Sequence, residues 1–194
     1  MKGEFNEALL DKFSVASAHI DAAIELFFRS RNLIGAHTLA WAALEVMRAD
    51  ADEGEVRTSM RGMEERIRPE HLVEFRRYMK SSFYFFKHSG KDDGFTRFDA
   101  SIVEYTIFFA CYDYHRIYGA NTWKMSYFSS FFLNRNPDYL KGDGRELMAS
   151  VFEYFQGDTS FSKGRELINE MCDLEERGLF DPTKFRFHRI ELLA

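Results

Sequence analysis

Residues 35–49 read GAHTLAWAALEVMRA, and this stretch decides the fold class. Its apolar side chains cover nearly the whole circumference of a helix and do not alternate as they would in a strand. A helix that is apolar all round is buried, and its many alanines allow neighbouring helices to approach closely. We therefore expect a central helix over residues 35–49 with other helices packed around it.

The flanking segments also carry helical spacing. Apolar residues recur every three or four positions across residues 4–30, with Asp21, Glu25 and Arg29 on the opposite face. The expected core residues of this helix are Phe13, Ala16, Ile20, Ala23, Ile24 and Phe27.

Further along, residues 50–68 are charged and interrupted by glycine, which predicts a loop with a short helix. Pro69 fits the first turn of a helix expected over residues 69–88. Helices are also expected over residues 99–118, 123–132, 147–155 and 161–177, with a loop over residues 91–98. The tail at residues 184–190 alternates and predicts a short strand or an extended arm.

These elements predict an all-α helical bundle. Residues 1–120 are expected to form an up-down core of about four helices. Residues 121–194 are expected to form an aromatic-rich C-terminal helical extension, packed on the core as one structural unit. The chain has 21 Phe, 9 Tyr and 2 Trp, and we expect some of these rings to reach the surface, where they would mark a partner interface.

The charge and composition of the chain argue against several classes of protein. The net charge is -5, with 26 basic and 31 acidic residues, whereas nucleic-acid binders are usually basic. Cys111 and Cys172 are far apart and form no metal-binding or redox spacing, which favours a reducing compartment. The N-terminus lacks a signal-peptide pattern, and no run approaches the ~20 apolar residues of a membrane span. We expect a cytoplasmic protein that uses no membrane and no cofactor.

The segment Phe85-Phe86-Lys87-His88 contains two catalytic candidates, Lys87 and His88, and a third, Asp92, lies shortly after it. Two cations at the end of a helix are favoured by the helix dipole and by the free carbonyl groups there, which explains Lys87 and His88 structurally. The alternative is a cation and an imidazole at the mouth of a pocket, with Asp92 orienting His88 for proton transfer.

A second set of candidates is the stripe of His37, Trp41 and Glu45 on the central helix. Eight residues separate His37 from Glu45, which is about 12 Å along one helix, too far for a shared ion with bonds of about 2 Å. We therefore expect no metal site, and each of these two side chains to pair with a group on a neighbouring helix. The alternative is a ligand pocket lined by Trp41, His37 and Phe rings.

The helix expected over residues 69–88 carries a basic strip of Arg76, Arg77 and Lys80. Such a strip is usually a solvated face. The alternative is a patch that contacts phosphates, next to Tyr84, which could stack on bases. If the chain has a site, we expect it at the junction of this helix with the central one.

Three segments together resemble a widespread family of small, uncharacterised bacterial helical proteins. They are the helix containing AHIDAAIELF at residues 18–27, the helix containing HTLAWAALEV at residues 37–46, and FFKH at residues 85–88 followed by Asp92. The resemblance covers roughly residues 10–120. It departs from the family pattern at Tyr84, where the family has Asn, and at residues 89–91.

That family resembles HEPN domains at the level of the fold, which implies a small helical bundle, often dimeric, from toxin–antitoxin or defence systems. Some HEPN domains are ribonucleases that use an Arg followed, after four to six residues, by a His. Here His88 would need Arg at position 81, 82 or 83, where the chain has Ser81, Ser82 and Phe83. The resemblance therefore implies a homodimer but does not carry ribonuclease chemistry over.

Three functions stay open at this point. The leading expectation is a non-catalytic binding or protein-interaction module, since no catalytic motif is present and aromatic residues are in surplus. The first alternative is a HEPN-like nuclease or nucleotide-acting protein that uses His88, Lys87 and the basic strip. The second is a helical protein that binds a small ligand.

Overall fold

The computed structural model describes residues 10–87, 98–139, 158 and 160–181, and all regular structure in these ranges is helical. The predicted all-α fold is confirmed. The helices are α1 (Lys12–Glu25), the π-helix η1 (Leu26–Ser30), α2 (Leu33–Glu53), α3 (Ser59–Glu64), the 3-10 helix η2 (Pro69–His71), α4 (Leu72–Lys87), α5 (Ser101–Tyr118), α6 (Trp123–Arg135), the 3-10 helix η3 (Pro137–Tyr139) and α8 (Phe161–Glu176).

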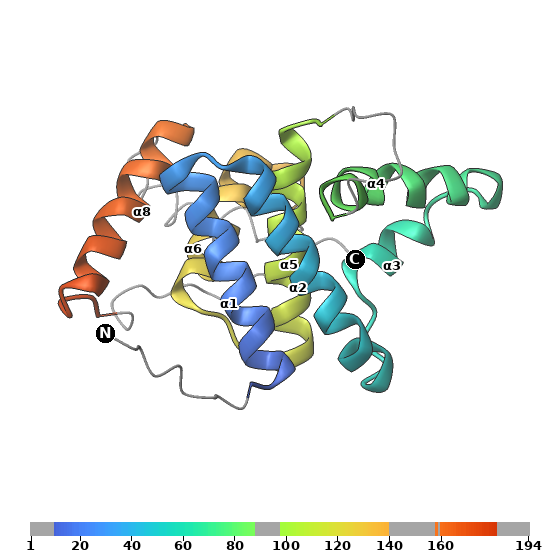
Figure 1. The fold of residues 1–194 in the computed structure, drawn as a ribbon, viewed down its shortest axis with the longest axis horizontal. Helices are drawn as coiled ribbons and strands as arrows, with labels where there is room; N and C mark the ends of the chain where they lie inside the picture. The colour runs from blue at the N-terminus through green and yellow to red at the C-terminus, as the bar shows by residue number, and fades with distance from the viewer. Residues whose placement is uncertain (1–9, 88–97, 140–157, 159, 182–194) are drawn as a thin grey trace, which may run out of the picture.

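Helix α2 contains the decisive stretch and packs against α1 on one side and α5 on the other (Figure 1). It extends beyond both ends of the expected range, from Leu33 to Glu53. Ala36, Ala40 and Ala43 are fully buried. Because these side chains are small, the backbones of α1 and α5 can lie close to that of α2.

Helices α6 and α8 complete the main core. One hydrophobic cluster takes buried residues from α1, η1, α2, α5, α6 and α8, so residues on both sides of position 120 contribute to the same core. The rings of Phe128, Phe131 and Phe132 on α6 are fully buried. Phe108 of α5 stacks on Phe132 with ring centroids 4.2 Å apart. Most aromatic rings in the described ranges therefore fill the core and leave little apolar surface for a partner.

Phe13 is the exception among the aromatic residues expected in the core, because 42% of it is exposed. It lies in the first turn of α1, and its ring still contacts Tyr114 and Tyr118, at 5.3 and 5.2 Å between centroids. The expected core position was wrong because α1 begins at Lys12, where only one side of the first turn meets α5. The other five expected core residues of this helix are buried.

The end of the first helix differs from a regular α-helix. Residues 26–30 form the π-helix η1, and Arg31 ends this helix with a positive φ of 54°. A π-turn adds one residue to the helical turn and changes which side chains point inward. Phe27 and Phe28, adjacent in sequence, are both buried as a result. Phe27 contacts Phe161 at 5.2 Å and Phe28 contacts Phe131 at 5.0 Å between centroids, which links η1 to α8 and α6.

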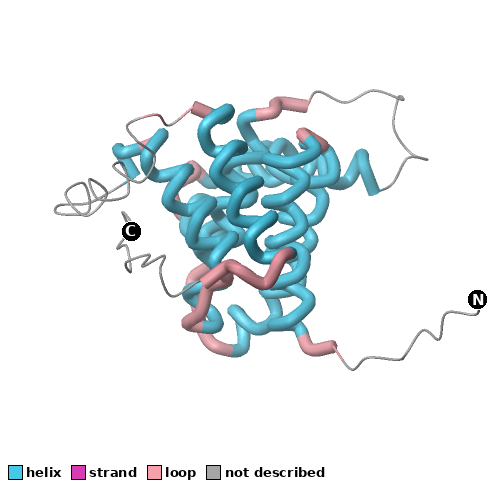
Figure 2. The backbone as a smooth tube through the Cα atoms, turned by 90° about the vertical axis from the view of Figure 1, so that its left-hand side faces the viewer, coloured by secondary structure: helices cyan, strands magenta, loops and turns pink. Residues whose placement is uncertain are grey.

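Helices α3 and α4 lie on the opposite side of the molecule from α8 (Figure 1). The expected short helix in residues 50–68 is α3, and the helix expected from Pro69 begins as the 3-10 turn η2. Helix α4 contacts α2 through a small separate cluster of Trp41, Met79 and Phe83. Figure 2 shows the helices from a second side, with loops as the only other structure in the described ranges. The helix expected over residues 147–155 and the tail at residues 184–190 lie outside those ranges.

Candidate functional site

A pocket of about 490 Å³ lies where α2, α3, α4 and α5 meet. Its size falls within the range of roughly 300–1,000 Å³ that is typical of small-molecule sites. The wall is formed by Trp41, Leu44, Glu45, Arg48 and Asp52 of α2, Thr58, Met60, Arg61 and Glu64 in and before α3, Arg76 and Lys80 of α4, and Asp113 of α5. Most of these side chains are charged, and both signs are present.

The structure brings four of the predicted binding residues together in this pocket. Trp41 and Glu45 face it from α2, and Arg76 and Lys80 line it from α4. The predicted junction of the two helices is therefore a real feature of the fold. What the pocket binds stays a prediction.

The other predicted residues lie elsewhere. Arg77 is exposed on α4 and does not line the pocket. Tyr84 and Lys87 belong to α4, but their side chains are not among those that the structure describes. His88 and Asp92 lie outside the described residues, so the proposed catalytic group of Lys87, His88 and Asp92 stays a prediction.

His37 separates from the rest of its stripe. It is fully buried and its ring lies 5.9 Å from that of Phe98 and 6.2 Å from that of Trp41. Burial lowers the pKa of His37 to about 4, so the imidazole is neutral at pH 7. Glu45, by contrast, is exposed. The stripe therefore divides into a core histidine, a tryptophan at the pocket and an exposed carboxylate.

The basic strip on α4 is engaged within the chain. The Nε and Nη2 atoms of Arg76 donate to the two carboxylate oxygens of Glu64, both at 2.7 Å. This hydrogen bond to the guanidinium holds the pKa of Glu64 below its usual value. Because a bidentate pair occupies the planar fork of Arg76, that fork is not available to a phosphate in this arrangement. The geometry thus disfavours a free phosphate-contacting strip.

Asp113 is the most unusual side chain of the pocket. It is 2% exposed, and its Oδ1 accepts hydrogen bonds from the backbone N and the Oγ of Ser59, both at 2.7 Å. These bonds fix the start of α3 on α5. Burial raises the pKa of Asp113 to about 6, against the effect of the Ser59 bonds. Its Oδ2 has no hydrogen-bond partner among the described residues.

Trp41 provides a second buried polar atom without a partner. The side chain is 3% exposed, and its Nε1 makes no hydrogen bond to the described residues. Its ring lies 5.9 Å from that of Phe83 on α4. A buried donor or acceptor without a partner costs about 1–3 kcal/mol. Both atoms are enclosed by the protein and belong to side chains that line the pocket.

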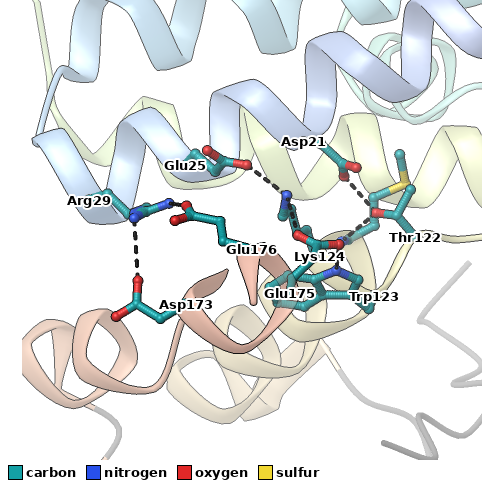
Figure 3. A network of polar contacts seen from close by, with 10 residues as sticks. Asp21, Glu25, Arg29, Thr122, Trp123, Lys124, Asp173, Glu175 and Glu176 are labelled. Carbon is teal, nitrogen blue, oxygen red and sulfur yellow. Dashed lines mark hydrogen bonds and ion pairs between the residues drawn. The ribbon is translucent and has the colours of Figure 1, made fainter. Parts of the chain in front are cut away.

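A different polar cluster joins α1, α6 and α8 on the other side of the core (Figure 3). Lys124 Nζ lies 2.7 Å from Glu25 Oε1 and 3.1 Å from Glu175 Oε2. Asp21 accepts a 2.6 Å hydrogen bond from Thr122 Oγ1, and burial raises its pKa to about 6. The polar face expected on the first helix is thus partly covered by α6 and α8.

The partners of this cluster all come from the chain itself. Trp123 Nε1 donates to Glu175 at 2.7 Å, and Arg29 lies 3.1 Å from Glu176 and 3.6 Å from Asp173. Burial disfavours the Lys124 ammonium, but its hydrogen bonds to Glu25 and Glu175 more than offset this and raise its pKa. We therefore interpret this cluster as a structural connection.

Sequence reasoning missed most of the pocket wall. Arg48 and Asp52 continue the helical stripe of Trp41 and Glu45, so periodicity could have found them. Asp113 follows the apolar run before it in the helix expected over residues 99–118, and a lone carboxylate beside buried residues is a recognisable signal. Residues 58–64 carry no such signal, because their place in the pocket depends on how α3 packs on α5.

The described part of the chain contains no group of three or more His, Cys, Asp or Glu side chains placed to hold a metal ion. Its two cysteines, Cys111 and Cys172, are free thiols and both are buried. Within the same ranges, no helix is both long enough and apolar enough to cross a membrane. Comparison with protein-family models, with curated proteins and with solved structures finds no match for this chain.

Proposed function

We propose that this protein binds a small polar molecule in the pocket between α2, α3, α4 and α5. The observation that carries this proposal is the pocket itself, whose wall combines the apolar side chains of Trp41, Leu44 and Met60 with charged side chains of both signs. The pocket volume of about 490 Å³ suits a molecule of that kind.

The same structure gives less support to a protein-interaction module. That expectation rested on surplus aromatic residues, and those of the described ranges mostly fill the core. The exposed large hydrophobic residues there are Leu10, Phe13, Ile34, Val73 and Leu179, of which only Leu10 and Phe13 are close in the sequence. The nuclease alternative loses support as well, because Arg76 is paired with Glu64.

Blocking the pocket tests the proposal. Met60 lines the pocket from α3, so Met60→Trp would fill it, whereas Val73→Trp adds the same ring to an exposed position of α4. We expect saturation-transfer NMR with a panel of water-soluble single-ring compounds, such as benzamide, benzoate and benzylamine, to give binding signals with wild type. These signals should persist with Val73→Trp and disappear with Met60→Trp. Equal signals with both variants would contradict the proposal.

The oligomeric state is a separate proposal that rests on the resemblance. We propose a cytoplasmic homodimer. Two free, buried thiols fit the reducing environment of the cytoplasm. Light scattering of the purified protein should give twice the chain mass of 22.8 kDa. A monomer at high micromolar concentration would contradict the dimer and leave the pocket proposal intact.

A further inference from the structure

Helix α3 is the least anchored of the four walls of the pocket. No residue of Ser59–Glu64, all of which the structure describes, is buried, whereas α2, α4 and α5 each place buried side chains in a hydrophobic cluster. The helix is six residues long and lies at the edge of the molecule, away from α1 and α8 (Figure 1). A segment with few buried apolar contacts opens at a lower free energy than global unfolding requires.

Polar contacts hold the two ends of α3. At its start, Ser59 donates from its backbone N and its Oγ to Asp113 Oδ1 of α5, both at 2.7 Å. At its end, Glu64 accepts two 2.7 Å hydrogen bonds from Arg76 of α4. The Glu64 and Arg76 side chains are 21% and 50% exposed, so solvent competes for this pair. The two ends are therefore fastened to two different helices by contacts that can break while the main core stays intact.

Both connections of α3 are turns. Before the helix, Gly54 and Glu55 form a turn in which Glu55 has a positive φ of 53°, and the carbonyl of Arg57 accepts a 3.0 Å hydrogen bond from Arg116 of α5. After the helix, residues 65–67 form a second turn that leads to Pro69. Turns at the ends of an element absorb the dihedral changes of a hinge. The segment 54–68 can therefore swing as a unit.

The inner face of α3 covers apolar side chains. Met60 and Met63 are partly buried and pack against the cluster of Trp41, Met79 and Phe83. Methionine side chains are flexible and adapt to new contacts, so this packing can separate and form again. Trp41 is 3% exposed and its Nε1 atom is enclosed by the protein. Movement of α3 away from α2 and α4 therefore brings water to the cluster.

We infer that α3 is a hinged wall of the pocket. It swings away from α2 and α4, widens the pocket, uncovers the cluster around Trp41 and then closes again. The Ser59–Asp113 hydrogen bonds and the Arg76–Glu64 pair are its two latches. That this movement admits a ligand rests on the proposed function. The movement itself is measured without a ligand, so its failure and the failure of the proposed function are distinguishable.

Hydrogen exchange of the Trp41 indole N–H measures the opening in the unmodified chain. The exchange is followed by NMR after transfer into heavy water, and the loss of one signal in Trp41→Phe assigns it. The slowest backbone amides of α2 report global unfolding in the same sample. We expect the Trp41 indole to exchange at least about tenfold faster than these amides, because the opening of α3 leaves the main core folded.

The latch at the start of α3 is tested by Ser59→Ala. We expect this change to speed exchange of the Trp41 indole about tenfold, since a hydrogen bond to a buried carboxylate is lost. Ser101→Ala is the matched control. Ser101 also donates from its backbone N and Oγ to one carboxylate oxygen, that of Asp99, but this contact lies at the start of α5. It should leave the indole exchange unchanged.

The latch at the end of α3 is tested by Glu64→Gln. We expect it to speed exchange of the Trp41 indole about two- to fivefold, as the loss of a partly exposed ion pair does. Glu65→Gln is the matched control, because the ion pairs of Glu65 join it to Arg57 and Arg61 of the same segment. It should leave the indole exchange unchanged.

Two results would overturn the inference. One is a Trp41 indole that exchanges no faster than the slowest amides of α2, since the pocket wall would then open only when the whole chain unfolds. The other is unchanged indole exchange in both Ser59→Ala and Glu64→Gln, since the two contacts would then not hold α3. Should Ser59→Ala fail to fold, wild type and Glu64→Gln decide the matter.

Discussion

Two polar regions of this molecule are built from similar residues and differ in where their partners come from. The α1–α6–α8 cluster places Lys124 between Glu25 and Glu175 and pairs Trp123 Nε1 with Glu175. The pocket also has a tryptophan, a lysine and carboxylates, but Trp41 Nε1 and Asp113 Oδ2 have no partner among the described residues. The first region is complete within the chain, whereas the second surrounds an open volume of about 490 Å³.

The difference shows that burial and charge alone do not identify a functional site. Asp21 is half-buried and Asp113 is buried, and burial raises the pKa of each to about 6. Perturbed pKa values occur in structural networks as well as in active sites. What distinguishes the two regions is the open volume that the charged side chains of the pocket surround.

We expect the largest effect from a substitution that overfills the tight contact between α8 and the core. A Cβ added at Gly164 of α8 would lie 2.6 Å from Phe131 Cε2 and 3.0 Å from Phe28 Cε1. The carbonyl of Gly164 also accepts a buried 2.6 Å hydrogen bond from Tyr127. We expect Gly164→Ala to lower the free energy of unfolding by about 3 kcal/mol, as overpacked cores do, when measured by urea denaturation.

Gly62→Ala is the control for this change. Gly62 is also helical, and its nearest neighbour would be the Arg57 side chain at 3.7 Å. It should leave stability unchanged or raise it by roughly 0.5 kcal/mol. Similar losses in both variants would show that the effect comes from the helix backbone and not from the contact of α8 with the core.

The next effect concerns the pH dependence of stability. The folded-state pKa of Asp21 is about 6, above its ordinary value of 3.8, because the carboxyl is buried. The folded chain therefore binds more protons between pH about 4 and 6, and this site loses stability as the pH rises through that window. We expect Asp21→Asn to abolish that loss and to be about 2 kcal/mol more stable than wild type at pH 7, after the weaker bond to Thr122 is allowed for.

Thermal melts of Asp21→Asn and wild type from pH 4 to 8 measure this difference. Asp173→Asn is the matched control, since its carboxyl is 64% exposed, and it should follow wild type. Parallel melting curves for Asp21→Asn and wild type across the pH range would contradict the account of this buried carboxyl.

A smaller effect compares the two lysines directly. Lys124 is 12% exposed and contacts two carboxylates, which are themselves partly exposed. We expect Lys124→Met to lower the free energy of unfolding by about 1 kcal/mol, and Lys80→Met to change it by less than about 0.5 kcal/mol. Urea denaturation at low and high salt checks both. Equal losses would mean that Lys80, too, is held by partners within the chain.

Much of the fold was predictable from the sequence because helical periodicity is a local signal. The Ala-rich run at residues 36–43 and the spacing from Ala16 to Phe27 place the central helices. The π-turn at residues 26–30 was not predictable, because it depends on Phe27 and Phe28 both finding space between α6 and α8. The partners of the polar face of α1 were not predictable for the same reason, since they come from residues about one hundred positions away.

The site was predictable in part. Trp41 and Lys80 were identifiable as candidates, because Trp41 shares a helical stripe with His37 and Glu45 and Lys80 belongs to the basic strip of α4. Asp113 gained its role only when Ser59 took one of its oxygens and left the other without a partner. Such an imbalance depends on the tertiary structure and cannot be read from the spacing of residues.

The most direct test of the central claim uses the two tryptophans of the chain, one in each region. Trp123→Phe leaves Trp41 as the only emitter, and Trp41→Phe leaves Trp123. On titration with a single-ring compound that binds wild type, we expect the emission of Trp123→Phe to change and saturate, while the emission of Trp41→Phe stays constant. A saturating change in Trp41→Phe together with none in Trp123→Phe would contradict the account, since the ligand would then bind beside the region whose partners the chain already supplies.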